Sequence, residues 1–294
     1  MPAPQILLAS CAALPRSDGD DDGLVDALGE LGLHADWAPW DDESAPFANA
    51  DLVVLRSTWD YTARLEEFLA WCARVPRLAN AAPVVRWNTD KAYLLDLAAA
   101  GVPVVPSAFL APGEPLPAEL PDTGDGVVLK PAVGAGSRGA GRFADREAAQ
   151  AHLDELHRDG LTVLLQPFQS SVATSGEVAV VFLGGVYSHA FTKGSMLAGS
   201  GVDASGLFRS ERLGAVRPDG ERRRVAEDVL DAAAGTLGVA RSELLYARVD
   251  VVAGADGAPL LLELELTEPS LGFRQADDAA PARFASAVRG ALRR

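Results

Sequence analysis

Apolar segments of two different periods alternate along the first 75 residues. The runs QILLAS (residues 5–10) and DLVVLRST (51–58) are apolar enough to be buried strands, and the second ends in polar residues. Helical spacing of apolar residues predicts a helix over GLVDALGELGLHADW (23–37), followed by a second strand, and another over LEEFLAWCARV (65–75). Alternating strands and helices favour a parallel sheet in an α/β domain.

Polar and aromatic residues follow the strand at 51–58. Ligands of parallel sheets gather beyond the carboxyl ends of the strands, where RSTWDY would lie. Arg56, Trp59, Asp60 and Tyr61 are therefore candidate substrate-binding residues that could grip an amino acid or a similar small zwitterion. The alternative is structural: the two aromatic residues pack a loop and Arg56 pairs with Asp60.

The next apolar period predicts a helix that begins near Asp90 and ends at Gly101, with Asn88 or Thr89 as its cap. Lys91 then lies in the first turn. A cation is disfavoured there by the helix dipole, so an anionic partner outside the helix is one interpretation and a solvated lysine is the other.

A Pro-rich loop at 111–126 leads into GVVLKPAVGAGSRGAGRF, a predicted strand with Lys130 at its end, a turn from Gly134 to Gly141, and a second strand. Although Gly134, Gly136 and Gly139 satisfy G-x-G-x-x-G, the dinucleotide fingerprint must open a helix. Here a proline intervenes, and the next clear helix starts only around residue 145. The GK[ST] ending of a P-loop is missing too.

What remains is a flexible hairpin. Its backbone N–H groups at Gly134, Gly136 and Ser137, together with Lys130 and Arg138, could close over phosphates. A plain surface hairpin is the alternative.

Two further segments follow the helix after this hairpin. TVLLQPFQSS is a short strand in which Gln166, Pro167 and Phe168 have the composition of an interdomain hinge, with exposed backbone groups able to bind a planar base. A strand pair in GEVAVVFLGGVYSHAFTKG carries residues 177, 189 and 193. A single histidine on a strand, His189, is more often packed than functional, and a substrate contact is the other interpretation.

A hairpin near the C-terminus gathers carboxylates. Arg248 and Asp250 share one face of the strand LLYARVDVV, and the turn AGADGAP leads to LLLELEL, where Glu263 and Glu265 also share a face. Three carboxylates on one apolar surface repel one another and are costly to bury, so a divalent cation, Mg²⁺ or Mn²⁺, is expected among them. Arg248 adds positive charge for a transferring phosphoryl group. Glu268 does not follow the alternation of Glu263 and Glu265 and stands next to Pro269, so it is expected to be a loop acid or an acid that supports the ligands from behind.

Length, net charge, apolar runs and cysteine content together limit the kinds of protein that this chain can be. With 294 residues, two or three lobes sharing clefts are expected. The formal charge of -15 argues against nucleic acid as a partner. No apolar run approaches the twenty residues of a membrane span, and no basic segment precedes the first strand, so we expect a cytoplasmic protein without a membrane partner. Cys11 and Cys72 fit neither a disulfide framework nor a zinc site; both are expected to be reduced and structural, with a reactive Cys11 as the alternative.

The ordered set of motifs resembles the ATP-grasp ligases, such as glutathione synthetase and D-alanine:D-alanine ligase. It runs from Lys91 through VLKP, the glycine-rich hairpin, QPF and RVD to ELELTEP, so the resemblance covers most of the chain. It implies an N-terminal α/β domain with a parallel sheet (1–86), followed by two α+β subdomains that sandwich ATP: a small lid subdomain (87–169) and a C-terminal metal-binding subdomain (170–294).

The resemblance also implies roles for single residues. The loop 134–141 would be the lid, residues 166–168 would line the adenine site, and Glu177 would hold ribose or an adjacent basic group. Glu265 stands where the family usually has an asparagine, which adds negative charge to the metal site. Phosphate contacts would come from Lys91, Lys130 and Lys193, catalytic charge from Arg248, Lys130 and Lys193, and metal ligands from Asp250, Glu263 and Glu265.

The implied activity is phosphorylation of a substrate carboxylate by ATP, followed by attack of a nitrogen nucleophile on the acyl phosphate. RSTWDY, VVRWNTDK, LLYARVD and ELELTEPSL are most similar to the cyclo-ligases that close O-ureido-D-serine into D-cycloserine. Other interpretations stay open: an amide ligase joining two amino-acid-like substrates, a nucleotide-dependent oxidoreductase, and a non-catalytic binding protein. The expected partner is a small amino-acid-like molecule, and a homo-oligomer is compatible with the sequence.

Overall fold

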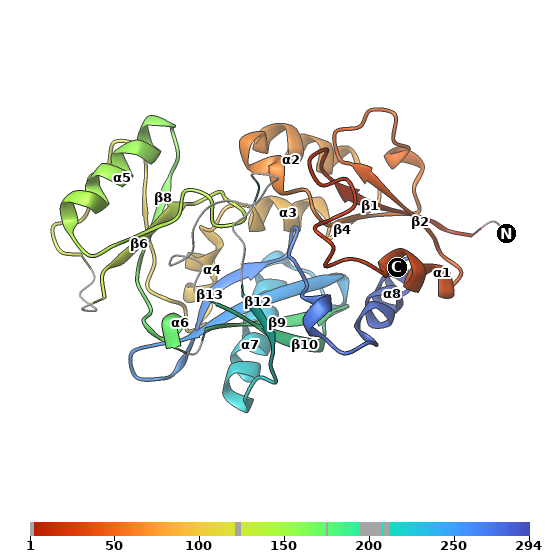
Figure 1. Cartoon of the computed structure of the whole chain (residues 1–294). Coiled ribbons are helices and arrows are strands. Elements are labelled where there is room, and N and C mark those ends of the chain that lie inside the picture. Colours follow the sequence, from red (N-terminus) through yellow and green to blue (C-terminus); the bar gives the residue numbers. More distant parts are fainter. Residues whose placement is uncertain (1–2, 121–124, 175, 195–206, 208–211) are drawn as a thin grey trace.

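The computed structural model describes residues 3–120, 125–174, 176–194, 207 and 212–294. Its chain forms three sheets in sequence order (Figure 1). The first is parallel, as the alternation of strands and helices predicts, with strand order β2-β1-β3-β4. Its elements are β1 (Gln5–Ser10), α1 (Leu24–Glu30), β2 (His34–Pro39), β3 (Leu52–Leu55), α2 (Leu65–Arg74) and β4 (Leu78–Ala79).

Helix α1 is shorter than its apolar spacing predicts. The expected helix over 23–37 ends at Glu30, and the segment HADW belongs to β2, which pairs with β1 from Gln5↔His34 onward. Gly32 lies between the two elements with φ of 74°, a left-handed conformation that ends the helix. Apolar residues on both sides of this glycine mimic a single helical stripe.

The second sheet is antiparallel, with strand order β5-β8-β6-β7. The predicted glycine-rich hairpin is confirmed as the β6–β7 connection, and helix α5 packs on the sheet through Leu153 and Leu156. Asp145 caps this helix by accepting a hydrogen bond from the Ala148 N–H at 2.8 Å. The elements are β5 (Ala108–Leu110), β6 (Val127–Pro131), β7 (Gly141–Phe143), α5 (Arg146–Arg158) and β8 (Val163–Pro167).

The third sheet is also antiparallel, with order β11-β10-β9-β12-β13, and its two faces enter different cores. Val180 and Phe182 of β9 face the core that contains α7, whereas Val181 faces a core shared with the N-terminal sheet and α8. The strands are β9 (Glu177–Leu183), β10 (Val186–Lys193), β11 (Leu213–Ala215), β12 (Tyr246–Ala253) and β13 (Pro259–Glu265), and the helices are α6 (Ser171–Thr174), α7 (Gly220–Leu237) and α8 (Ala280–Ala291).

The helix predicted from Asp90 to Gly101 is present as α4 (Tyr93–Ala99), which is shorter at both ends, and a further short helix that was not predicted, α3 (Ala82–Asn88), precedes it. Asn88 does not cap a helix. Its buried amide donates to the carbonyl of Leu264 at 2.8 Å and accepts from the N–H of Leu266 at 2.6 Å. Lys91 consequently lies in the turn between the two helices, held close to the end of β13. Four 3₁₀ turns complete the described elements: Phe47–Asn49, Trp59–Ala63, Arg241–Glu243 and Phe273–Gln275.

Helix α4 packs mainly on the third sheet. Leu94 and Leu97 lie in the core formed by β9, β12 and α7. The predicted boundaries of the three domains stay a prediction, with α3 and α4 as the junction between them. Residues 121–124 of the predicted Pro-rich loop lie outside the described residues.

Burial determines the protonation of the two cysteine thiols. Cys11 and Cys72 are both buried, and desolvation raises the pKa of each thiol. Both thiols therefore stay protonated at neutral pH. In the part of the chain that the structure describes, no helix has the length and apolar character needed to cross a bilayer.

Candidate active site

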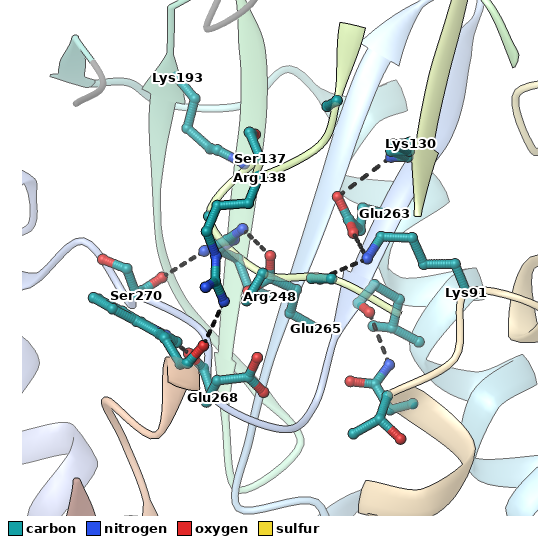
Figure 2. Close-up of a pocket in the computed structure, with 18 of the residues that line it drawn as sticks. Lys91, Lys130, Ser137, Arg138, Lys193, Arg248, Glu263, Glu265, Glu268 and Ser270 are labelled. Carbon is teal, nitrogen blue, oxygen red and sulfur yellow. Dashed lines mark hydrogen bonds and ion pairs between the residues drawn. The ribbon is translucent and has the colours of Figure 1, made fainter. Parts of the chain in front are cut away.

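A cavity of about 360 Å³ lies where the three sheets meet, and Figure 2 shows the charged side chains that line it. Its walls come from the ends of β6, β10, β12 and β13, from the glycine-rich loop, and from the 3₁₀ turn after β3. The lining residues with charged side chains are Asp18, Lys91, Lys130, Arg138, Lys193, Arg248, Glu263, Glu265, Glu268 and Arg274.

The β12–β13 hairpin brings the predicted acids together. In its register Arg248 lies opposite Glu265 and Asp250 lies opposite Glu263, which confirms the shared face expected from the alternation of residues. Carboxylate oxygens from Asp250, Glu263 and Glu265 all lie within 4.8 Å of one another. Three oxygen ligands at this spacing fit the donor chemistry of Mg²⁺.

Two lysines from separate elements meet Glu263. The Nζ atom of Lys91, from the turn between α3 and α4, lies 3.0 Å from one carboxylate oxygen. The Nζ atom of Lys130, at the end of β6, lies 3.6 Å from the other. Burial alone would raise the pKa of Glu263, but the neighbouring ammonium groups outweigh it and lower the pKa to about 2. Glu263 is therefore ionised at neutral pH.

The fully buried Asp250 has cations on two sides. Its Oδ2 atom lies 2.9 Å from Nζ of Lys193 and 2.8 Å from Nη2 of Arg248. The same cations also bind other acids: Lys193 lies 2.5 Å from Glu177, and Arg248 lies 2.5 Å from Glu265. Burial opposes ionisation of Asp250, yet the two cations hold its pKa well below the ordinary value.

These contacts correct the premise that only a divalent cation can offset the acids. Four carboxylates (Glu177, Asp250, Glu263, Glu265) are matched by four cations (Lys91, Lys130, Lys193, Arg248). With every group ionised, the formal charges of the set cancel, and burial, which raises the pKa of Glu177 to about 8, only reduces the negative charge further. A metal at the three-carboxylate cluster fits the geometry, but charge balance does not require it. The assignment of these residues as metal ligands stays a prediction.

The glycine-rich loop folds over the cavity as a hairpin and opens no helix, so the dinucleotide interpretation of its three glycines has no structural support. Gly139 has φ of +70°, and a Cβ atom there would lie 2.9 Å from the ring of Pro131, so packing explains this glycine. Gly134 accepts a hydrogen bond from Nζ of Lys91 at 2.8 Å. Gly136 and Ser137 also line the cavity.

Arg138 extends from this loop to the N-terminal unit. Its Nη2 atom donates to the carbonyl of Trp59 at 2.9 Å and to the hydroxyl of Thr62 at 2.5 Å. Figure 2 shows the guanidinium pointing away from Lys130. In this structure Arg138 therefore links the loop to the turn after β3, and its predicted phosphate contact stays a prediction.

Only part of the predicted RSTWDY substrate site reaches the cavity. Trp59 and Tyr61 line it, but Arg56 is buried elsewhere and pairs with Asp21 at 2.7 Å. This corrects both interpretations of Arg56, as a substrate ligand and as a partner of Asp60. Its true partner lies 35 residues away, in the segment after β1.

Asp60 is likewise structural. One carboxylate oxygen accepts from the indole N–H of Trp40 at 2.8 Å, and the other accepts from Arg64 at 2.9 Å. With both oxygens bound to protein groups and the side chain outside the cavity wall, the predicted substrate contact of Asp60 is corrected as well.

His189 is a packed residue. Because a carbonyl can only accept, Nε2 donates to Leu271 O at 2.7 Å, and Nδ1 accepts from the hydroxyl of Ser188 at 2.9 Å. The ring lies outside the cavity lining, so the predicted substrate contact is corrected. Burial lowers the pKa of His189, and the nearby positive charge of Arg283 adds to this.

A pH-dependent contribution to stability follows from this environment. Below about pH 6.5 the unfolded chain protonates His189 while the folded chain resists it, so its stabilising contribution, present above that pH, is lost as the pH falls. We expect His189→Gln, whose amide can still donate to Leu271, to lose less unfolding free energy than the wild type between about pH 7 and pH 5. Urea denaturation at both pH values measures the difference; equal losses would contradict it.

The predicted hinge lies in the second sheet and does not line the cavity. Gln166 pairs in register with Val128, and the N–H of Phe168 donates to the carbonyl of Gly126 at 2.9 Å. The backbone of Gln166 and the N–H of Phe168 are therefore paired within the second sheet. The predicted exposure of the backbone at Gln166, Pro167 and Phe168 is wrong for these groups. The guanidinium of Arg142 stacks 3.7 Å from the ring centroid of Phe168. A role for residues 166–168 in nucleotide binding stays a prediction.

One wall of the cavity was not predicted from the sequence. Ser270 and Arg274, from the segment after β13, line it together with Asp18, from the segment after β1. Asp20 joins these segments, accepting from the N–H of Gly272 at 2.8 Å and from the hydroxyl of Ser270 at 3.2 Å. The sequence signal was the Pro and Gly of TEPSLG, directly after the acidic strand, which force a turn back toward the cavity.

A parallel sheet followed by two antiparallel sheets, with lysines and carboxylates where they meet, defines the ATP-grasp fold. D-alanine–D-alanine ligase from Bacillus anthracis shares it, with a TM-score of 0.70 over 99% of this chain and 98% of that one, at 15% identity. The cycloserine biosynthesis protein DcsG of Streptomyces lavendulae is 39% identical, covering 96% of both chains. The chain therefore belongs to the DcsG family of ATP-grasp ligases.

Two further comparisons agree with this assignment. Residues 6–80 match the family described as D-cycloserine synthetase DcsG, N-terminal domain. The crystal structure of D-cycloserine synthetase DcsG superimposes with a TM-score of 0.87 at 36% identity, covering 98% of this chain and 99% of that one. The resemblance to ATP-grasp ligases read from the motifs is thus confirmed.

Proposed function

We propose that this protein is an ATP-dependent cyclo-ligase that converts O-ureido-D-serine to D-cycloserine. The observation that carries the proposal is the cavity itself, where three lysines and an arginine surround carboxylates beside an aromatic wall. The 39% identity to DcsG over nearly the whole chain supports the substrate.

The proposed reaction has two steps. A carboxylate oxygen of the substrate attacks the terminal phosphorus of ATP, and ADP leaves. The alkoxyamine nitrogen then attacks the acyl carbon and the phosphate leaves, which closes the ring. The carbamoyl group is released with one water molecule as carbon dioxide and ammonia. No protein nucleophile is needed.

The cations of the cavity would serve the first step. Lys91, Lys130 and Lys193 would bind phosphate oxygens and stabilise the charge that develops during transfer. Burial lowers the pKa of Lys130, although Glu263 opposes this, so a bound phosphate would favour its charged form. Mg²⁺, or alternatively Mn²⁺, would be held by the three-carboxylate cluster and would neutralise phosphate oxygens.

The second step depends on Arg248 and the lid. Arg248 donates to Asp250, to Glu265 and to the carbonyl of Ser270 at 3.0 Å, which fixes its guanidinium at the cavity wall. From there it would stabilise negative charge on the acyl group. The loop 134–141, closed over the cavity, would exclude water that hydrolyses an acyl phosphate. Residues 166–168 would contact the adenosine part, and Glu177 would hold the adjacent Lys193, whose Nζ atom lies 2.5 Å away.

An assay of ADP release tests this function. We expect ATP, Mg²⁺ and O-ureido-D-serine together to give ADP and D-cycloserine in equal amounts, with D-serine and D-alanine giving neither product. Coupled spectrophotometry measures ADP, and mass spectrometry identifies the ring. Turnover only with two amino acids present together would identify an amide ligase, and no turnover with O-ureido-D-serine would refute the proposal.

A further inference from the structure

We propose that Glu268 binds the α-ammonium group of the amino-acid substrate. This proposal rests on the proposed function, because it concerns the orientation of a substrate whose carboxylate is activated in the same cavity. It assigns Glu268, which the sequence predicts to be a loop acid or an acid that supports the ligands from behind, as a specificity-determining residue.

Glu268 differs from the other acids of the cavity in its lack of an ion pair among the described residues. Glu263, Glu265 and Asp250 each have a lysine or arginine at ion-pair distance. Among the described residues, no Lys, Arg or His nitrogen forms an ion pair with Glu268 within 4 Å, although only 8% of this residue is exposed; Lys91 and Arg248 attract it electrostatically. A buried carboxylate without a counter-ion is unfavourable by several kcal/mol. A cationic ligand group would remove that cost.

Protein contacts hold Glu268 in place but supply no counter-ion, and burial raises the pKa of its carboxyl group to about 8; a bound ammonium group would favour the ionised form. The Tyr61 side chain lies beside its carboxyl group and partly offsets the effect of burial on its pKa, and the indole N–H of Trp59 donates to its backbone carbonyl at 2.9 Å. Both aromatic residues line the cavity. They exclude water around the carboxylate while leaving it able to accept further hydrogen bonds from a ligand.

The position of Glu268 matches the shape of an α-amino acid. In the view of Figure 2, Lys91 and Lys130 lie to the right of Arg248, and Glu268 lies below it. A substrate carboxylate bound near Arg248 and the lysines carries its ammonium group only one carbon away. That ammonium group can then face Glu268, with the rest of the substrate against Trp59 and Tyr61.

A metal ligand role is the main competing explanation, and the geometry does not favour it. The three carboxylates whose oxygens converge within 4.8 Å are Asp250, Glu263 and Glu265, and Glu268 is not among them. An ammonium group also suits the site chemically, because it supplies three hydrogen-bond donors and one positive charge.

The experiment pairs a protein change with a substrate change. The probes are O-ureido-D-serine and 3-(ureidooxy)propanoic acid, which lacks only the amino group. For the wild type we expect kcat/KM about 100-fold higher with the amino compound, as for loss of a charged hydrogen bond. For Glu268→Gln we expect this ratio to fall to near one, with the KM for ATP unchanged. Calorimetric binding of both probes in the presence of a non-hydrolysable ATP analogue gives a second readout.

The controls make each outcome decisive. Glu268→Asp keeps the charge and should retain most of the preference, while Glu66→Gln, at an exposed position on α2, should behave as the wild type. An undiminished preference in a folded Glu268→Gln protein, or a wild type indifferent to the amino group, overturns the assignment of Glu268 alone. A wild type that turns over neither probe overturns the proposed function with it.

Discussion

Glu263→Gln is expected to reduce the rate of ADP formation by about 1,000-fold, the range found when a group that organises transition-state charge is removed. Glu263 contacts Lys91 at 3.0 Å and Lys130 at 3.6 Å and belongs to the cluster that fits Mg²⁺. Glutamine can still accept a hydrogen bond from Lys91, so the fold should be retained. Steady-state ADP release and a thermal melt measure the two effects.

The matched control is Glu155→Gln, at an exposed position on α5 whose nearest cationic partner is a histidine 3.8 Å away. It should retain wild-type turnover. Turnover of Glu263→Gln within a few-fold of the wild type would show that neither the lysines nor a metal depend on this carboxylate.

Asp21→Asn is expected to lower the unfolding free energy by about 3 kcal/mol, because it leaves a buried guanidinium without its counter-ion. The side chains of Arg56 and Asp21 are 1% and 3% exposed, and they form three hydrogen bonds. The guanidinium also lies 5.6 Å from the ring centroid of Tyr246. The midpoint of urea denaturation at neutral pH measures the loss.

The neighbouring Asp22 provides the comparison. Its side chain is 79% exposed and lies 3.6 Å from Arg274, so Asp22→Asn should leave the midpoint almost unchanged. Equal shifts for the two variants would mean that the buried ion pair does not stabilise the fold.

The strands that carry the acids of the cavity, β12 and β13, could be predicted because their geometry is local. Alternation along β12 and β13 places Arg248, Asp250, Glu263 and Glu265 on one face, and a short turn fixes which residues lie opposite each other. The glycine-rich hairpin was predictable for the same reason. Its two strands and turn occupy 17 consecutive residues, from Val127 to Phe143.

Residues with distant partners could not be assigned in this way. Arg56 pairs with an aspartate 35 residues away, and His189 donates to a carbonyl 82 residues away. Nothing near either residue in the sequence specifies these contacts. Glu268 lies in the segment after β13, as its sequence position predicts, but the alternation of residues along β13 ends at Glu265, so the sequence did not indicate that the turn brings Glu268 back to the cavity.

The contact between Arg138 and the turn after β3 joins the glycine-rich loop 134–141 to the aromatic wall of the cavity. The guanidinium is bound to Trp59 and Thr62, within the same turn that presents Tyr61 to the cavity. If the loop 134–141 lifts, both hydrogen bonds of Arg138 break. The turn that carries Trp59 and Tyr61 then loses its contact with the loop at the same time. Under the proposed function, the same contact of Arg138 would then control both the entry of nucleotide and the exchange of the small molecule, so that phosphate and the ring product would leave together.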